Sequence, residues 1–155
     1  MIRDCTETDF DAILSIINDG ADAYRGIIPA DRWKEPYMPA DELRAEIGHG
    51  VAFSGFEAAG GLVGVMGAQN VADVALIRHA YVRGVRQGRG IGGSLLRHLL
   101  ERTDRPLLIG TWAAARWAAA RVSSPRWIFA SAHQTASSST PRSISVSTSC
   151  GRACP

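Results

Sequence analysis

The residues best suited to chemistry lie in a segment rich in glycine and arginine, residues 83–94. An apolar run precedes it and leucines at helical spacing follow it, which predicts the order strand, loop, helix. The first turn of such a helix presents unpaired backbone N–H groups and partial positive charge, and glycines let a phosphate approach them closely. The arginines Arg83, Arg86 and Arg89 add charge and can each bind phosphate through two hydrogen bonds. The segment therefore predicts a site for a phosphate or pyrophosphate group.

Two other phosphate-binding motifs match this segment poorly. The glycines Gly88, Gly90 and Gly93 satisfy the dinucleotide pattern G-x-G-x-x-G, but polar residues 83–87 separate them from the strand, whereas a dinucleotide turn is tight. The segment also follows a predicted hairpin, and no strand ending in an acid comes about twenty residues later. A P-loop is excluded because the chain has no Gly-Lys-Ser/Thr sequence. A glycine-rich turn that binds nothing is the remaining alternative.

The motif within this segment is similar to that of a known family. The sequence Tyr81-Val82-Arg83, followed by Gln87-Gly88-Arg89-Gly90-Ile91-Gly92, resembles the acyl-CoA signature Q/R-x-x-G-x-G/A of the GNAT (GCN5-related) N-acetyltransferase superfamily. The resemblance covers about residues 1–118. It implies an acetyl-CoA-dependent N-acetyltransferase in which loop amides hold the CoA pyrophosphate and the preceding strand end pairs with pantetheine. The implied CoA-binding residues are Tyr81, Val82, Arg83, Gln87, Gly88, Arg89, Gly90, Ile91, Gly92, Gly93 and Ser94.

The reaction that the resemblance implies is direct attack of an amine on a thioester carbonyl, which a backbone N–H would polarise. The amine of a small molecule or a protein must lose a proton, so a base is needed. His79, on the predicted central strand, has a side chain whose reference pKa of about 6.5 suits a base, and a packed core histidine is the alternative. Glu57, at a strand end, is either a base or a solvated hairpin carboxylate. Tyr81 and Tyr24 place hydroxyls in the site or pack as buried rings.

The chain departs from the family pattern after its last predicted strand. There the family has a helix with N-x-x-A-x-x-F-Y, whose tyrosine often protonates the CoA thiolate. Aligning Ala118 with the motif alanine places Arg121 and Val122 at the Phe-Tyr positions, and no tyrosine follows Tyr81. The family's general acid therefore has no counterpart here. A CoA-binding protein with impaired or no catalysis is the alternative function.

The elements that must position these residues follow from periodicity. Thr6, with Asp9 three residues on, resembles a capping box and predicts a helix start. Residues 24–40 hold three aromatics and three prolines and predict either a packed surface connection or a substrate-facing lid. The order of elements predicts an α/β (α+β) fold, with a mixed, mainly antiparallel sheet flanked by helices. The predicted elements are a strand at 2–5, helices at 8–23, 41–50 and 91–103, a hairpin of 51–56 with 62–66, a central strand at 74–82 buried on both faces, and a strand at 106–109. Strict alternation along the central strand places Ile77, His79 and Tyr81 on one face.

Composition bounds the remaining possibilities. With 155 residues and 46% apolar content, the chain predicts one soluble domain without a membrane span or signal peptide. Cys5, Cys150 and Cys154 are too few for a disulfide framework, so a cytoplasmic location is predicted. No metal site is expected. All fifteen acids lie between residues 4 and 104, whereas residues 105–155 hold six arginines. These arginines come with few aromatics and no known motif, so no nucleic-acid partner is predicted.

The absence of acids coincides with the loss of the family pattern, and we divide the chain into a CoA-binding domain, residues 1–118, and an atypical segment, 119–155. Residues 122–155 hold ten serines and no sustained apolar period. One hypothesis is a shift of reading frame near residues 116–122; the other is a divergent C-terminus. Residues 127–130 and 143–147 could form strands. A sheet left incomplete would expose an edge for pairing with a second copy of the chain.

Overall fold

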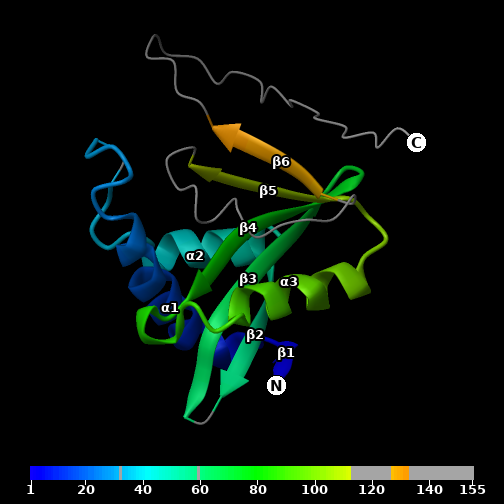
Figure 1. Ribbon diagram of the computed structural model, residues 1–155, viewed down its shortest axis with the longest axis horizontal. Coiled ribbons are helices and arrows are strands. Elements are labelled where there is room, and N and C mark those ends of the chain that lie inside the picture. The colour runs from blue at the N-terminus through cyan, green and yellow to red at the C-terminus, as the bar shows by residue number, and fades with distance from the viewer. Residues whose placement is uncertain (32, 59, 113–126, 133–155) are drawn as a thin grey trace.

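The computed structural model describes residues 1–31, 33–58, 60–112 and 127–132, which form one six-stranded sheet with helices on both faces (Figure 1). The strand order follows the chain, and the strands are β1 (Ile2–Asp4), β2 (Ala52–Ala58), β3 (Gly61–Val71), β4 (Val74–Val82), β5 (Leu107–Trp112) and β6 (Trp127–Ala132). The helices are α1 (Phe10–Ala21), α2 (Ala40–Gly48) and α3 (Ile91–Arg102), with short 3-10 turns at Glu7–Asp9, Asp22–Tyr24 and Gly84–Arg86. Strands β1 to β4 pair antiparallel, and β4, β5 and β6 pair parallel. The predicted mixed α+β class is confirmed.

Two apolar cores lie on opposite faces of the sheet. On one face, α1 and α2 cover β2 and β3, with Ile16, Leu43 and Val65 fully buried. On the other face, α3 packs through Ile91 and Leu95 against β3, β4 and β5. The amphipathic periods seen in the sequence account for these faces, because each helix buries the stripe that its apolar residues form.

The N-terminal elements largely follow the prediction. The backbone N–H of Thr6 donates to the carboxylate of Asp9 over 2.8 Å, as expected of a capping box, and the predicted helix 8–23 is α1 with a 3-10 turn at each end. The predicted hairpin is present as β2 and β3, although β3 continues to Val71 and not to residue 66. The central strand has the predicted bounds, Val74–Val82.

An irregularity in β4 corrects the predicted faces of this strand. In the pairing of β4 with β3, Gly67 lies opposite His79 and Ala68 opposite Ile77, so Arg78 is an extra residue on β4. Such a bulge reverses the alternation of side chains along a strand. Ile77 therefore packs in the α3 core, whereas His79 stacks on Phe53 in the opposite core. The sequence had placed His79 and Ile77 on one face, which is wrong because the bulge is set by the neighbouring strand.

The two central strands separate beyond this bulge. The parallel pairing of β4 with β5 covers only Ala75–Ile77, paired with Leu107–Ile109, and beyond it the strands diverge (Figure 1). Along residues 78–82, β4 thus pairs with β3 on one side and with no described strand on the other. Residues 78–82 of β4 lead into the glycine loop, residues 83–90. Among the described strands none pairs with their second edge, which is called the open edge below.

The last strands extend the sheet. β5 runs to Trp112, and β6 pairs parallel with it over six residues, so the run 127–130, which the sequence left open as a strand, forms one. The run 143–147, the region where the family has its helix and the border at residue 118 lie outside the described residues. Within the described ranges, no helix combines the length and apolarity needed to cross a membrane.

Candidate active site

The glycine loop joins the open end of β4 to the first turn of α3. After the 3-10 turn Gly84–Arg86, the backbone takes positive φ at Gly88 and Gly90, +76° and +79°. Gly90 precedes the first residue of α3, and its left-handed conformation is one that glycine adopts without steric cost. The loop is mostly exposed and ends at the N-terminus of α3. The predicted strand, loop and helix order is confirmed.

Helix α1 anchors the entrance of this loop. A carboxylate oxygen of Asp19 accepts the backbone N–H of Gly84 at 2.7 Å, and the Arg83 guanidinium donates to Ser15 Oγ at 3.1 Å. Arg83 also donates to the carbonyl of Leu62. The side chain of Arg83 therefore contacts α1 and β3, and its predicted part in CoA binding stays a prediction.

The remaining charge of the loop is available for a ligand. Neither Arg86 nor Arg89 has an ion-pair partner among the described residues. A Cβ at Gly92 or Gly93 would meet no atom within 4 Å, and neither glycine has positive φ. Glycine costs about 1 kcal/mol relative to alanine within a helix, so the fold gains nothing from glycine at these two positions. This open space at Gly92 and Gly93, called the open cradle below, adjoins the unpaired N–H groups of the first turn of α3, an arrangement suited to binding phosphate.

The centre of β4 carries the histidine. His79 is 7% exposed, and its ring stacks on Phe53 with centroids 5.6 Å apart. Its Nε2 is hydrogen-bonded to a carboxylate oxygen of Glu46 on α2, and Arg78 lies 3.4 Å from the other oxygen. Its Nδ1 is buried and has no hydrogen-bond partner within the described part of the chain. His79 thus combines the packed core position with an acid–base partner that the sequence had not indicated.

Glu46 is the residue that sequence reasoning missed. Burial of its side chain would raise its pKa, but the hydrogen bond with His79 and the nearby positive charge of Arg78 lower the pKa below the usual glutamate value. A signal was present in the sequence, because Glu46 follows the buried Leu43 by three residues and so shares its helix face. The carboxylate is therefore held ionised against β4.

Tyr81 lies two residues after His79, with ring centroids 6.2 Å apart. Its hydroxyl donates to the Tyr37 hydroxyl over 3.2 Å, and Tyr24 meets its ring edge-on at 6.4 Å. Burial raises the pKa of Tyr81 far above the usual tyrosine value, so the phenol stays protonated. The aromatic loop 24–40 thus packs on the site through two tyrosines.

The same loop is fixed by its own polar contacts. Trp33 donates to Glu35 over 3.1 Å and packs on Tyr37, and Arg25 lies over the Trp33 ring. The side-chain amide of Asn18 in α1 accepts a hydrogen bond from the backbone N–H of Met38 and donates one to its carbonyl. These contacts agree with a packed connection, and the substrate-facing lid stays a prediction, although the loop also contacts Tyr81.

Glu57 lies apart from the pair of His79 and Tyr81. Its carboxylate forms an ion pair with Arg3 at 3.4 Å and its side chain is 37% exposed. Its carbonyl accepts a hydrogen bond from the N-terminal amino group. The structure thus brings two of the three predicted catalytic residues together and places Glu57 in a contact between β1 and β2.

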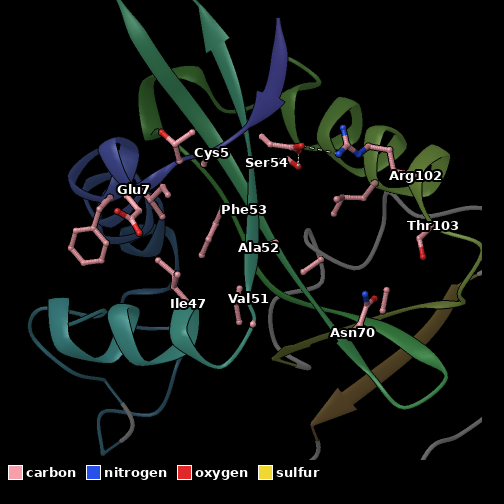
Figure 2. Close-up of a pocket in the computed structure, with 18 of the residues that line it drawn as sticks. Cys5, Glu7, Ile47, Val51, Ala52, Phe53, Ser54, Asn70, Arg102 and Thr103 are labelled. Atoms are coloured by element: carbon pink, nitrogen blue, oxygen red, sulfur yellow. Dashed lines mark hydrogen bonds and ion pairs between the residues drawn. The ribbon is translucent and has the colours of Figure 1, made fainter.

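A groove of about 1070 Å³ lies at the edge of β2, away from the glycine loop (Figure 2). It exists because β1 pairs only with residues 54–56, so Val51–Phe53 border open space. Figure 2 shows Cys5 and Phe53 on one side and Arg102 on the other. Burial raises the pKa of the Cys5 thiol to about 11, which keeps it protonated and unsuited to nucleophilic chemistry. None of the predicted site residues lines this groove.

The geometry can be compared with known proteins. No protein-family model and no curated protein matches the sequence. Among solved structures, the chain is similar to the PaiA N-acetyltransferase of Thermoplasma acidophilum in complex with coenzyme A, with TM-score 0.55, 21% identity, and coverage of 66% of this chain and 70% of that chain. It is also similar to a ribosomal-protein-alanine N-acetyltransferase of Brucella melitensis, with TM-score 0.50, 25% identity, and coverage of 66% and 65%.

A third similar structure is a GCN5-related N-acetyltransferase of Rhodopseudomonas palustris, with TM-score 0.54, 16% identity, and coverage of 66% of this chain and 64% of that chain. The chain spans about two thirds of the length of these three proteins. The likeness is one of fold, and in this chain the fold places a mixed sheet with diverging central strands before a glycine loop and a helix. The described part of this chain has the GNAT fold of the N-acetyltransferases.

Proposed function

We propose that this protein is an N-acetyltransferase that uses acetyl-CoA and transfers the acetyl group to an amine of a small molecule or a protein. The observation that carries the proposal is the continuity of the open β4 edge, residues 78–82, with the glycine loop and the N-terminus of α3. Solved structures of this fold that contain coenzyme A support it.

The binding part of the proposal assigns the loop to the CoA pyrophosphate. Backbone N–H groups between Gln87 and Ser94 would donate to the phosphate oxygens, with Arg86 and Arg89 adding charge. The open cradle at Gly92 supports this assignment, because a side chain there would occupy the space of the ligand. The exposed amide edge of β4 near Tyr81 would pair with the amides of pantetheine, as a strand pairs with an extended peptide.

The chemical part of the proposal concerns the protein groups around the acyl position. The bound thioester supplies an activated acetyl group. A backbone N–H at the open edge of β4 would stabilise negative charge on the carbonyl oxygen. His79 would accept a proton from the amine, and Tyr81, protonated because it is buried, would exchange its hydrogen bond to Tyr37 for one to the substrate. Glu57 has no part in this proposal because it pairs with Arg3.

A second candidate is a CoA-binding protein without turnover. It is favoured by one observation: no tyrosine follows Tyr81 in the sequence, so the usual family position for the general acid holds none. Both candidates share the CoA site and differ only in chemistry.

Thiol release from acetyl-CoA with a panel of amines, measured beside CoA binding by calorimetry, tests the proposal. We expect binding and amine-dependent release. Binding with no release for any amine would favour the second candidate, and absence of binding would contradict both.

A further inference from the structure

The contact between Glu46 and His79 joins two elements that the sequence places 33 residues apart. Glu46 lies in the last turn of α2, with its side chain 18% exposed, and His79 lies on β4 directly after the bulge at Arg78. A carboxylate removed from water in this way is costly unless it is paired. The ring of His79 and the guanidinium of Arg78 supply that pairing.

The two ring nitrogens of His79 have different surroundings. A carboxylate can only accept a hydrogen bond, so the nitrogen that contacts Glu46, Nε2, carries a hydrogen. In the neutral ring, Nδ1 then carries the lone pair and is the proton acceptor. This Nδ1 is buried and without a partner among the described residues. A buried polar atom without a partner is rare and is a common mark of a functional group.

The groups that face the ring are few. Glu46 comes from α2, Arg78 and Tyr81 from β4 itself, and Phe53 from β2 covers the ring face. Tyr81 is hydrogen-bonded to Tyr37 of the aromatic loop and is kept neutral by burial. Glu46 is thus the negative charge placed against the ring, partly balanced by Arg78.

We propose that Glu46 is a positioning residue that fixes the Nε2–H form of His79, so that Nδ1 accepts the proton of the acceptor amine. This inference rests on the proposed acetyltransferase function. A purely structural contact between α2 and β4 would equally explain the bonded Nε2, but it gives no reason for an unpartnered Nδ1 at the end of the β4–β5 pairing.

The proposed proton transfer begins at the acceptor ammonium. One N–H bond of the acceptor ammonium breaks, and an Nδ1–H bond forms on His79, directly or through one water. The freed amine lone pair attacks the acetyl carbonyl carbon. The new C–N bond forms and the C–S bond breaks, with its electron pair passing to sulfur. Sulfur takes the second proton lost by nitrogen, and His79 returns the first proton to solvent. Glu46 stabilises the imidazolium during this interval.

The test compares Glu46→Gln with Glu42→Gln, which removes a carboxylate from the same helix where it pairs with Lys34 and is 40% exposed. For Glu46→Gln we expect kcat/KM to fall about 10-fold or more, by analogy with other groups that orient a functional histidine. Glu46→Asp should restore part of this loss, and Glu42→Gln should match the wild type.

A second measurement does not depend on activity. Nitrogen chemical shifts of the His79 ring report which nitrogen carries the hydrogen, and we expect the Nε2–H form in the wild type and a mixture in Glu46→Gln. An Nδ1–H form in the wild type overturns the proposal, whatever the activity. An active wild type whose Glu46→Gln variant keeps the wild-type kcat/KM and the same ring-nitrogen shifts overturns this inference and leaves the proposed function standing. An inactive wild type, with every amine tested, overturns both.

Discussion

The glycine loop and the centre of β4 are neighbouring parts of one candidate site, and they are built in different ways. The loop offers exposed backbone, with open space where a Cβ at Gly92 would lie. The centre of β4 offers the buried side chain of His79, packed between Phe53 and the carboxylate of Glu46. The first arrangement suits a large charged ligand that arrives from solvent, and the second suits proton transfer in a site that excludes water.

This difference has a consequence for how the two regions respond to substitution. Groups in the loop contribute little to the packing of the fold, so changes there should affect ligand binding with little effect on stability. Groups around His79 belong to a close-packed core, so adding or removing one methyl group there should lower the free energy of unfolding.

The largest expected effect is on the loop. Gly92→Leu places four carbon atoms in the open cradle, and we expect CoA affinity to fall about 100-fold, equivalent to about 2.7 kcal/mol. Stability should not fall, because nothing in the fold lies within 4 Å of that Cβ. Calorimetry and thermal melting measure both quantities. Gly48→Leu, another helical glycine with open space, is the matched control and should leave affinity unchanged. Equal loss of affinity in both variants would contradict the assignment.

The same small change in each region gives the clearest contrast. A Cβ at Gly67 would lie 2.8 Å from the ring of Phe53, which is itself stacked on His79. Gly67→Ala should therefore cost about 1–3 kcal/mol of unfolding free energy through overpacking. Gly93→Ala, at the start of α3, should cost nothing or stabilise by up to about 1 kcal/mol. Denaturant unfolding of the two variants checks this, and equal stabilities would erase the distinction between the regions.

A smaller effect is expected where the two regions are joined. Asp19→Ala removes the carboxylate that accepts the Gly84 N–H at 2.7 Å. Loss of this bond should cost about 1 kcal/mol of stability and lower CoA affinity a few-fold, because the loop entrance loses its anchor. Asp11→Ala, on the exposed side of the same helix, is the control for loss of charge from α1. If Asp19→Ala changes neither quantity more than Asp11→Ala does, the hydrogen bond does not hold the loop.

The smallest effect concerns the Tyr81 hydroxyl. Tyr81→Phe removes its bond to Tyr37 and should cost about 0.5–1 kcal/mol at pH 8. Because burial raises the pKa of Tyr81 in the folded protein, the unfolded chain ionises first, near pH 10, so this contribution is present below pH 10 and is lost as the pH rises further. The stability difference between wild type and variant should therefore shrink above pH 10. A difference that stays constant up to pH 11 would contradict this account.

Much of the fold could be predicted from patterns within single segments of the sequence. The apolar run of β4 and the stripe of α1 predict their elements because period and burial are encoded within each segment. The glycine loop was predictable for the same reason, since its glycines and arginines are contiguous in the chain.

The parts that escaped prediction depend on contacts between distant segments. The bulge at Arg78 is defined by pairing with β3, and it decides which face His79 occupies. The Arg83 guanidinium donates a hydrogen bond to Ser15, 68 residues away. Glu46 on α2 is hydrogen-bonded to His79 on β4. The spacing of Glu46 from the buried Leu43 places it on the inner helix face, but it does not show which distant residue it meets there.

The most direct test of the central claim is to titrate the 15N-labelled protein with CoA and to map the amide resonances that shift. The account predicts that the largest shifts fall on residues 87–94, with a second set on residues 78–83 along the open edge of β4. Shifts confined to the groove around Phe53 and Arg102, or no shifts at millimolar CoA, would contradict it.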